Sequence, residues 1–179
     1  MTFRSFALSL VLGAALAANA GAASRNETSK DWTASLEEVD TGEDVRKTCT
    51  GWTAARDEAG KDWTLKLAIG DGDVLPPDAY PQLSITAAAG GLNKAENQPA
   101  TFDFGGKEVE AKVSGGGNEV MVDNVKETSL ALLKALAAGD RLTVTLTGKP
   151  SPALSLSGFT ASYRKLGQWC GFPTADVAK

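Results

Sequence analysis

The clearest hydrophobic pattern in the chain is a strict alternation between Trp63 and Ile69. Every second residue of this segment is apolar, and the residues between them are small or polar. A period of two predicts a strand with one buried and one solvated face. A turn-rich segment at 58–61 separates this strand from a Thr-rich segment at 45–56, so we predict a β-hairpin.

Further short patterns of this kind occur along most of the chain, bounded by Gly, Pro, Asn and Asp. Gly105 and Gly106 lie between two of them and suit a two-residue hairpin turn. The polar segment 90–98 and the glycine-rich segment 115–118 are predicted to be turns. The additional strands are predicted over residues 31–39, 82–88, 101–104, 107–113, 119–125, 141–147 and 153–157.

The period changes in the C-terminal half. Residues 129–138 are rich in Leu and Ala and follow the helical period; Thr128 or Ser129 is placed to cap the N-terminus, and Gly139 follows the last turn. A second helix is predicted over residues 158–168. The whole pattern predicts a mainly β fold, an antiparallel β-sandwich or flattened barrel with two short helices in the C-terminal half.

Residues 1–23 have the layout of a secretory signal peptide. A positive charge at Arg4 precedes an apolar run over residues 6–17, and small residues follow it. This run is shorter than the roughly 20 residues that a membrane-spanning helix needs. We therefore predict export to the periplasm or the exterior, cleavage within residues 20–23, and no membrane insertion.

Residues 31–173 are predicted to form a single β-rich domain. Residues 24–30 are polar and are expected to be a disordered mature N-terminus, and residues 174–179 a loose tail. The chain has 18 Lys and Arg against 22 Asp and Glu, a formal net charge of −4, and loss of Arg4 with the signal would make it more negative. Such a surface repels phosphate groups, so nucleic acid is not an expected partner.

Cys49 and Cys170 are the two cysteines of the chain. In an oxidising compartment such a pair is expected to form a disulfide. The chain has no histidine, which excludes Ser-His-Asp and Cys-His catalysis and histidine-ligated metals. Ser162 and Lys165 have the spacing of a Ser–Lys acylase, but the companion motifs of those enzymes are missing. We therefore predict no enzyme activity and no cofactor.

The C-terminal segment 130–170 has a recognisable order of motifs. A Leu/Ala helix ends in Ala-Ala-Gly-Asp at 137–140, Arg-Leu-Thr-Val follows at 141–144, Leu-Ser-Leu-Ser-Gly-Phe-Thr-Ala follows at 154–161, and Cys170 closes the segment. This order resembles the C-terminal half of the invasion-associated locus B family of exported bacterial proteins. The resemblance implies a β-rich fold, an envelope location and an association with host-cell invasion, and it supplies no catalytic residues.

The best candidate for a binding surface is the loop over residues 70–81. Its prolines stiffen it, which lowers the entropy lost on binding, and its tyrosine is of a type enriched at interface hot spots. Its carboxylates do not match an EF-hand, although an irregular calcium site remains open. Among the four tryptophans, the best candidate for exposure is the one that faces away from Cys49 on its strand. The candidate partner-binding residues are Asp71, Asp73, Asp78, Tyr80 and Trp52.

These features favour a non-enzymatic exported domain of the envelope or periplasm that binds an envelope or extracellular protein. One alternative is a histidine-free glycoside hydrolase that uses two carboxylates about 5 to 9.5 Å apart. Another is a periplasmic inhibitor of a lytic enzyme, with loop 70–81 as the plug. A pocket with two converging carboxylates would favour the hydrolase.

Overall fold

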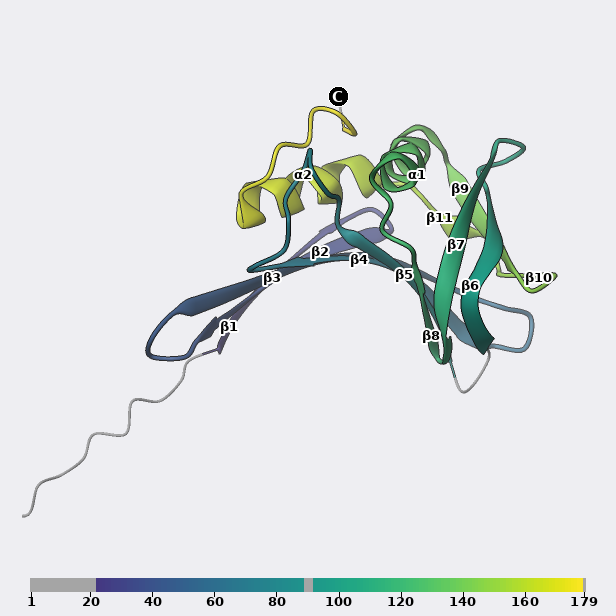
Figure 1. Cartoon of the computed structure of the whole chain (residues 1–179), viewed down its shortest axis with the longest axis horizontal. Coiled ribbons are helices and arrows are strands. Elements are labelled where there is room, and N and C mark those ends of the chain that lie inside the picture. Colours follow the sequence, from purple (N-terminus) through teal and green to yellow (C-terminus); the bar gives the residue numbers. More distant parts are fainter. Residues whose placement is uncertain (1–21, 89–91, 179) are drawn as a thin grey trace, which may run out of the picture.

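The computed structural model describes residues 22–88 and 92–178 (Figure 1). The predicted signal peptide lies outside the described residues, except for Ala22 and Ala23. Strands of the described part of the chain form one antiparallel sheet. They are β1 (Ala22–Ser29), β2 (Trp32–Asp40), β3 (Val45–Arg56), β4 (Asp62–Gly70), β5 (Gln82–Ala87), β6 (Leu92–Asp103), β7 (Glu108–Gly117), β8 (Glu119–Val122), β9 (Arg141–Leu146), β10 (Lys149–Pro150) and β11 (Leu154–Ser155).

The order of the strands divides the sheet into two groups. Strands β1 to β5 lie side by side in chain order, and β8, β7, β6, β9 and β10 follow them across the sheet. The second group is therefore attached to β5 through β8. Ser84 to Thr86 of β5 pair with Glu119 to Met121 of β8, a ladder of only three residue pairs. We call this short ladder the β5–β8 joint.

Two helices, α1 (Lys126–Ala138) and α2 (Phe159–Cys170), lie on the concave side of the strongly curved sheet (Figure 1). Helix α2 packs against β1, β2 and β3, and α1 packs against β7. The predicted mainly β fold with two short helices in the C-terminal half is confirmed, in the form of one curved and unclosed sheet. In the described part of the chain, no helix has the length and apolar character needed to span a bilayer.

The core under α2 is aromatic. Trp32, Phe159, Tyr163 and Phe172 contact one another in series, with ring centroids 5.0 to 5.7 Å apart. Trp32 is fully buried, and its indole N–H donates a hydrogen bond to the Ser155 carbonyl at 3.0 Å. The rest of the concave face is mainly aliphatic, with Phe102 of β6 and Trp63 of β4 among inward Leu, Ile, Val and Ala residues.

A disulfide and a glycine hold α2 on the sheet. The predicted bridge between Cys49 of β3 and Cys170 at the end of α2 is present, with the Cα atoms 6.2 Å apart. At the other end of the helix, Gly158 has a φ of 99°, and a Cβ built there would lie 1.8 Å from the Ser29 carbonyl oxygen. Only glycine permits this close approach between the helix start and edge strand β1.

The predicted N-terminal cap of α1 is wrong, whereas Gly139 follows the helix as predicted. The helix begins at Lys126, three residues before the predicted start, and neither Thr128 nor Ser129 caps it. The Ser129 hydroxyl instead contacts the Asn124 side chain at 2.9 Å. The backbone of Gly139 is extended. A Cβ there would lie 3.1 Å from the Ala135 carbonyl oxygen, so the position is crowded.

Two segments predicted to lack regular structure belong to strands. Residues 24–30, predicted to be disordered, largely belong to β1, whose exposed polar residues pair with β2 through the backbone. Residues 92–98 belong to β6, where two register shifts hide the alternating pattern. The predicted turn at 115–118 is present at Gly117-Asn118, which joins β7 to β8, while Gly115 and Gly116 belong to β7. The predicted loose tail packs on the molecule, since Val177 and Ala178 are buried.

Candidate functional site

Loop 70–81 is fixed to the sheet by its own carboxylates. Asp71 accepts a hydrogen bond from the Lys47 backbone N–H at 2.6 Å, and Asp73 accepts one from the Gly70 backbone N–H at 2.7 Å. The Asp71 N–H in turn donates to the Lys47 carbonyl at 2.9 Å. These two predicted binding residues therefore stabilise the base of the loop, while their side chains remain at the surface.

The prediction that Tyr80 offers a surface aromatic is wrong. Its side chain is 3% exposed, and its hydroxyl donates a hydrogen bond of 2.5 Å to Asp176 in the C-terminal tail. The Asn124 amide donates to the Tyr80 carbonyl at 2.9 Å. Burial, aided by the Asp176 hydrogen bond, raises the pKa of Tyr80 to about 12. Tyr80 therefore anchors the loop to the C-terminal tail. In Figure 1 the loop rises from the sheet and passes beside α2.

The tip of the same loop carries two exposed apolar side chains. Val74 is 62% exposed and Leu75 is 38% exposed. The backbone N–H groups of Asp78 and Ala79 both donate to the Leu75 carbonyl, so the tip is a hydrogen-bonded turn. Asp78 adds a loose ion pair with Lys126 at 3.9 Å. Sequence reasoning missed this apolar pair, although two consecutive apolar residues inside a polar loop are a visible signal.

Trp52 lies apart from the loop. On β3, Cys49, Gly51 and Thr53 are buried, so the half-buried Trp52 alternates to the opposite, convex face of the sheet. The loop rises on the helix side. The structure therefore brings Asp71, Asp73 and Asp78 together in one loop and leaves Trp52 on another surface.

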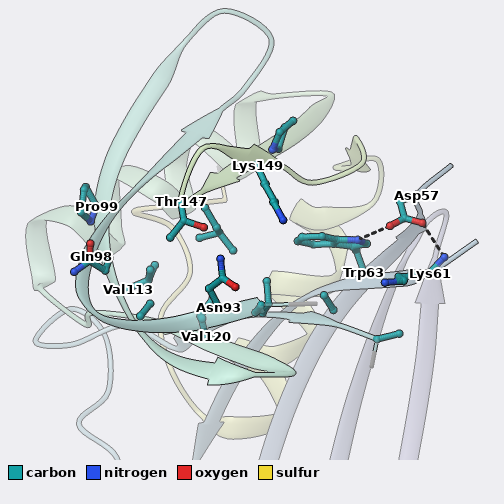
Figure 2. Close-up of a pocket in the computed structure, with 16 residues that line it drawn as sticks. Asp57, Lys61, Trp63, Asn93, Gln98, Pro99, Val113, Val120, Thr147 and Lys149 are labelled. Atoms are coloured by element: carbon teal, nitrogen blue, oxygen red, sulfur yellow. Dashed lines mark hydrogen bonds between the residues drawn. The ribbon is translucent and has the colours of Figure 1, made fainter. Parts of the chain in front are cut away.

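A second candidate site is a cavity of about 260 Å³ on the concave face of the sheet, shown in Figure 2. It lies where the β3–β4 turn, the ends of several strands and the β9–β10 turn meet, beyond the area that α1 and α2 cover. Its lining is Asp57, Lys61, Trp63, Ala87, Ala88, Leu92, Asn93, Ala95, Gln98, Pro99, Val113, Val120, Leu146, Thr147, Lys149 and Pro150.

The carboxylate in the cavity lining, that of Asp57, already accepts three hydrogen bonds. Asp57 accepts bonds from the backbone N–H groups of Lys61 at 2.8 Å and Ala59 at 3.0 Å, and from the Trp63 indole at 3.4 Å. These bonds, that from Lys61 foremost, lower the pKa of Asp57. The carboxylate therefore stays ionised, whereas the general acid of a glycosidase needs a raised pKa.

In the described residues, neither this cavity nor the Ser162–Lys165 pair forms the catalytic arrangement that the sequence left open. Asp57 is the one carboxylate in the cavity lining, so no second acid faces it. The Ser162 side chain is buried, and Lys165 pairs with Glu27 at 2.9 Å. Within the described ranges no three Asp, Glu, Cys or His residues gather as a metal site would require, those of loop 70–81 included.

No protein-family model, no curated protein and no solved structure matches the chain.

Proposed function

We propose that this protein is a non-enzymatic exported domain of the cell envelope that binds another protein through the tip of loop 70–81. The observation that carries the proposal is the exposure of Val74 and Leu75 on a loop that is fixed at both ends. Covering a side chain of this type completely contributes roughly 1.5–3 kcal/mol. Because the loop is already ordered, little conformational entropy is lost when a partner covers its tip.

The charge around the tip suggests the chemistry of the partner. Asp71, Asp73 and Asp78 lie in the same loop as the apolar pair, and Lys126 pairs with Asp78. A partner with an apolar cleft rimmed by Lys or Arg complements this surface. Such complementarity raises the association rate and makes it sensitive to salt.

Three observations support export to the envelope. Residues 1–23 have a signal-peptide layout, and the Cys49–Cys170 disulfide suits an oxidising compartment. The motif order of segment 130–170 resembles the invasion-associated locus B family, which adds an association with invasion to the proposal. The alternative role as an inhibitor uses the same tip, inserted into the active site of a lytic enzyme.

The test uses a photo-crosslinking residue at Val74, with Met121 as the matched control. Met121 is 51% exposed and alternates with the buried Val120 and Val122, so it reports on a comparable apolar residue on the convex face. We expect a discrete crosslinked protein from native envelopes at position 74, competed by unlabelled protein and absent at position 121.

Binding of the isolated partner then measures the contribution of the tip. The double variant Val74→Ser/Leu75→Ser should weaken binding by about tenfold or more, which is 1.4 kcal/mol, while Met121→Ser leaves it unchanged. The melting temperature should stay constant because all three side chains are exposed. Unchanged affinity of the double variant would place the interface elsewhere, and turnover of an envelope glycan by purified protein would overturn the non-enzymatic assignment.

A further inference from the structure

The cavity beside Trp63 is divided into an apolar floor and a polar rim. Its volume of about 260 Å³ lies just below the roughly 300–1,000 Å³ of drug-sized pockets, so it suits a small molecule rather than a peptide. The floor consists of Trp63, Leu92, Ala95, Val113, Val120 and Leu146. The rim consists of Lys61, Asn93, Gln98, Thr147 and Lys149.

The rim presents an excess of positive charge and hydrogen-bond donors. Lys149 is exposed and forms no ion pair with any described residue. The Asp57 carboxylate already accepts hydrogen bonds from two backbone N–H groups of its own turn and from the Trp63 indole. Figure 2 shows the Lys149 side chain extending toward the Trp63 indole, with the Asn93 amide and the Thr147 hydroxyl pointing into the same space. An ammonium, an amide and a hydroxyl thus line the same cavity above its apolar floor.

The turn that places two of these groups is strained. Thr147 and Gly148 connect β9 to β10, and both have positive φ, 48° and 79°. A β-branched residue in this conformation is a genuine outlier, and such strain costs of the order of 1–3 kcal/mol. Asn or Gly would adopt the turn more easily. The strained residue is the one whose hydroxyl faces the cavity, where strain commonly marks a ligand site.

We propose that this cavity binds a small organic monoanion, a carboxylate attached to an apolar body of about eight carbons or fewer. The carboxylate pairs with Lys149 and accepts hydrogen bonds from Asn93 and Thr147. The apolar body lies on Val113 and Val120 with the Trp63 ring beside it. The charge of Lys61 is offset by Asp57 in the same lining, so the Lys149 ammonium and the neutral donors balance a single negative charge, which favours a carboxylate over a doubly charged phosphate ester. This inference is independent of the loop tip and requires no protein partner.

Calorimetry with three probes of equal chain length tests the charge: octanoate, octanol and octylamine. We expect octanoate to bind at one site, about tenfold or more tighter than octanol, because a hydrogen bond to a charged group contributes roughly 1.5–3 kcal/mol. Octylamine should bind more weakly than octanol, since its ammonium faces Lys149. Equal affinity for all three probes, or no binding of octanoate, would overturn the proposal.

Three variants locate the site. Lys149→Gln should bring the affinity for octanoate to about that for octanol, whereas Lys112→Gln, the matched control on β7, should keep the preference because its exposed side chain alternates away from Val113. Asn93→Trp should fill the cavity and abolish binding. Lys149, Lys112 and Asn93 are exposed, so the melting temperature should confirm folded variants. Undiminished octanoate binding by Lys149→Gln or Asn93→Trp would refute the site.

Discussion

The hydrogen bond between Tyr80 and Asp176 ties loop 70–81 to the C-terminal tail, and its removal is the most informative stability test. Tyr80→Phe deletes the hydroxyl and keeps the buried ring. The bond joins a neutral donor to a carboxylate at 2.5 Å, and bonds to charged groups contribute roughly 1.5–3 kcal/mol. The other Asp176 oxygen is buried and has no partner among the described residues. The variant therefore leaves the whole carboxylate without a donor, and we expect a loss of about 2 kcal/mol.

Tyr163→Phe is the matched control. Tyr163 is fully buried, and its hydroxyl has no hydrogen-bond partner in the described structure. Removing an unpaired buried hydroxyl also removes a desolvation cost, so this variant should be neutral or slightly more stable, by up to about 1 kcal/mol. The same chemical change is thus expected to have opposite effects at two tyrosines of one core.

Urea unfolding followed by circular dichroism measures both variants. With slopes of about 1–3 kcal/mol/M, a loss of 2 kcal/mol lowers the midpoint by about 1 M. Carboxypeptidase digestion of the folded protein should also shorten the tail faster in Tyr80→Phe than in Tyr163→Phe. Equal midpoints for the two variants would refute the assignment of the stabilising bond to Tyr80.

Three further predictions concern other parts of the molecule. The pKa of Tyr80 is raised to about 12 in the folded state, so the folded protein holds the phenolic proton more tightly than the unfolded chain does. The resulting contribution to stability should be complete below about pH 10 and should be lost between pH 10 and 12. Urea midpoints measured across this range should therefore fall less in Tyr80→Phe than in the unmodified protein. Replacing Cys49 and Cys170 together by Ser should lower the free energy of unfolding by about 2–5 kcal/mol, because the bridge closes a loop of 121 residues. A smaller loss in urea unfolding would show that the packing of α2 holds the helix on the sheet without the bridge. Thr147→Asn should raise the free energy of unfolding by about 1 kcal/mol, because Asn-Gly suits a turn with two positive φ values, and a lower midpoint would contradict the strain described for this turn.

The strands that sequence analysis located correctly are those in which one feature dominates. The alternation from Trp63 to Ile69 reflects a regular strand with one buried face, and β4 covers it. Gly105 and Gly106 form the predicted turn, both with positive φ. In contrast, β1 is an edge strand whose side chains are nearly all exposed, so its pairing depends on backbone groups that leave no hydrophobic pattern.

The two candidate sites were harder to predict, because they depend on contacts between residues that are distant in the chain. Tyr80 is of a residue type common at binding surfaces, but its hydrogen bond to Asp176, 96 positions away, holds it in the interior. The cavity draws its lining from β3 to β10, and no single segment of it forms a motif. Its strained turn at Thr147 is invisible without backbone angles, since the pair Thr-Gly is compatible with many conformations.

The β5–β8 joint has a dynamic consequence. Its three residue pairs link the two groups of strands, whereas nine residue pairs join β3 to β4, so the joint should open locally at a lower free energy than β3 and β4 separate. Hydrogen exchange should therefore be faster for the amides of Ile85 and Val120 than for those at the centre of the β3–β4 ladder. Ala87 of β5 and Val120 of β8 both line the cavity. A molecule bound in the cavity would contact both strands of the joint. Its binding should therefore slow hydrogen exchange of the amides in the β5–β8 joint.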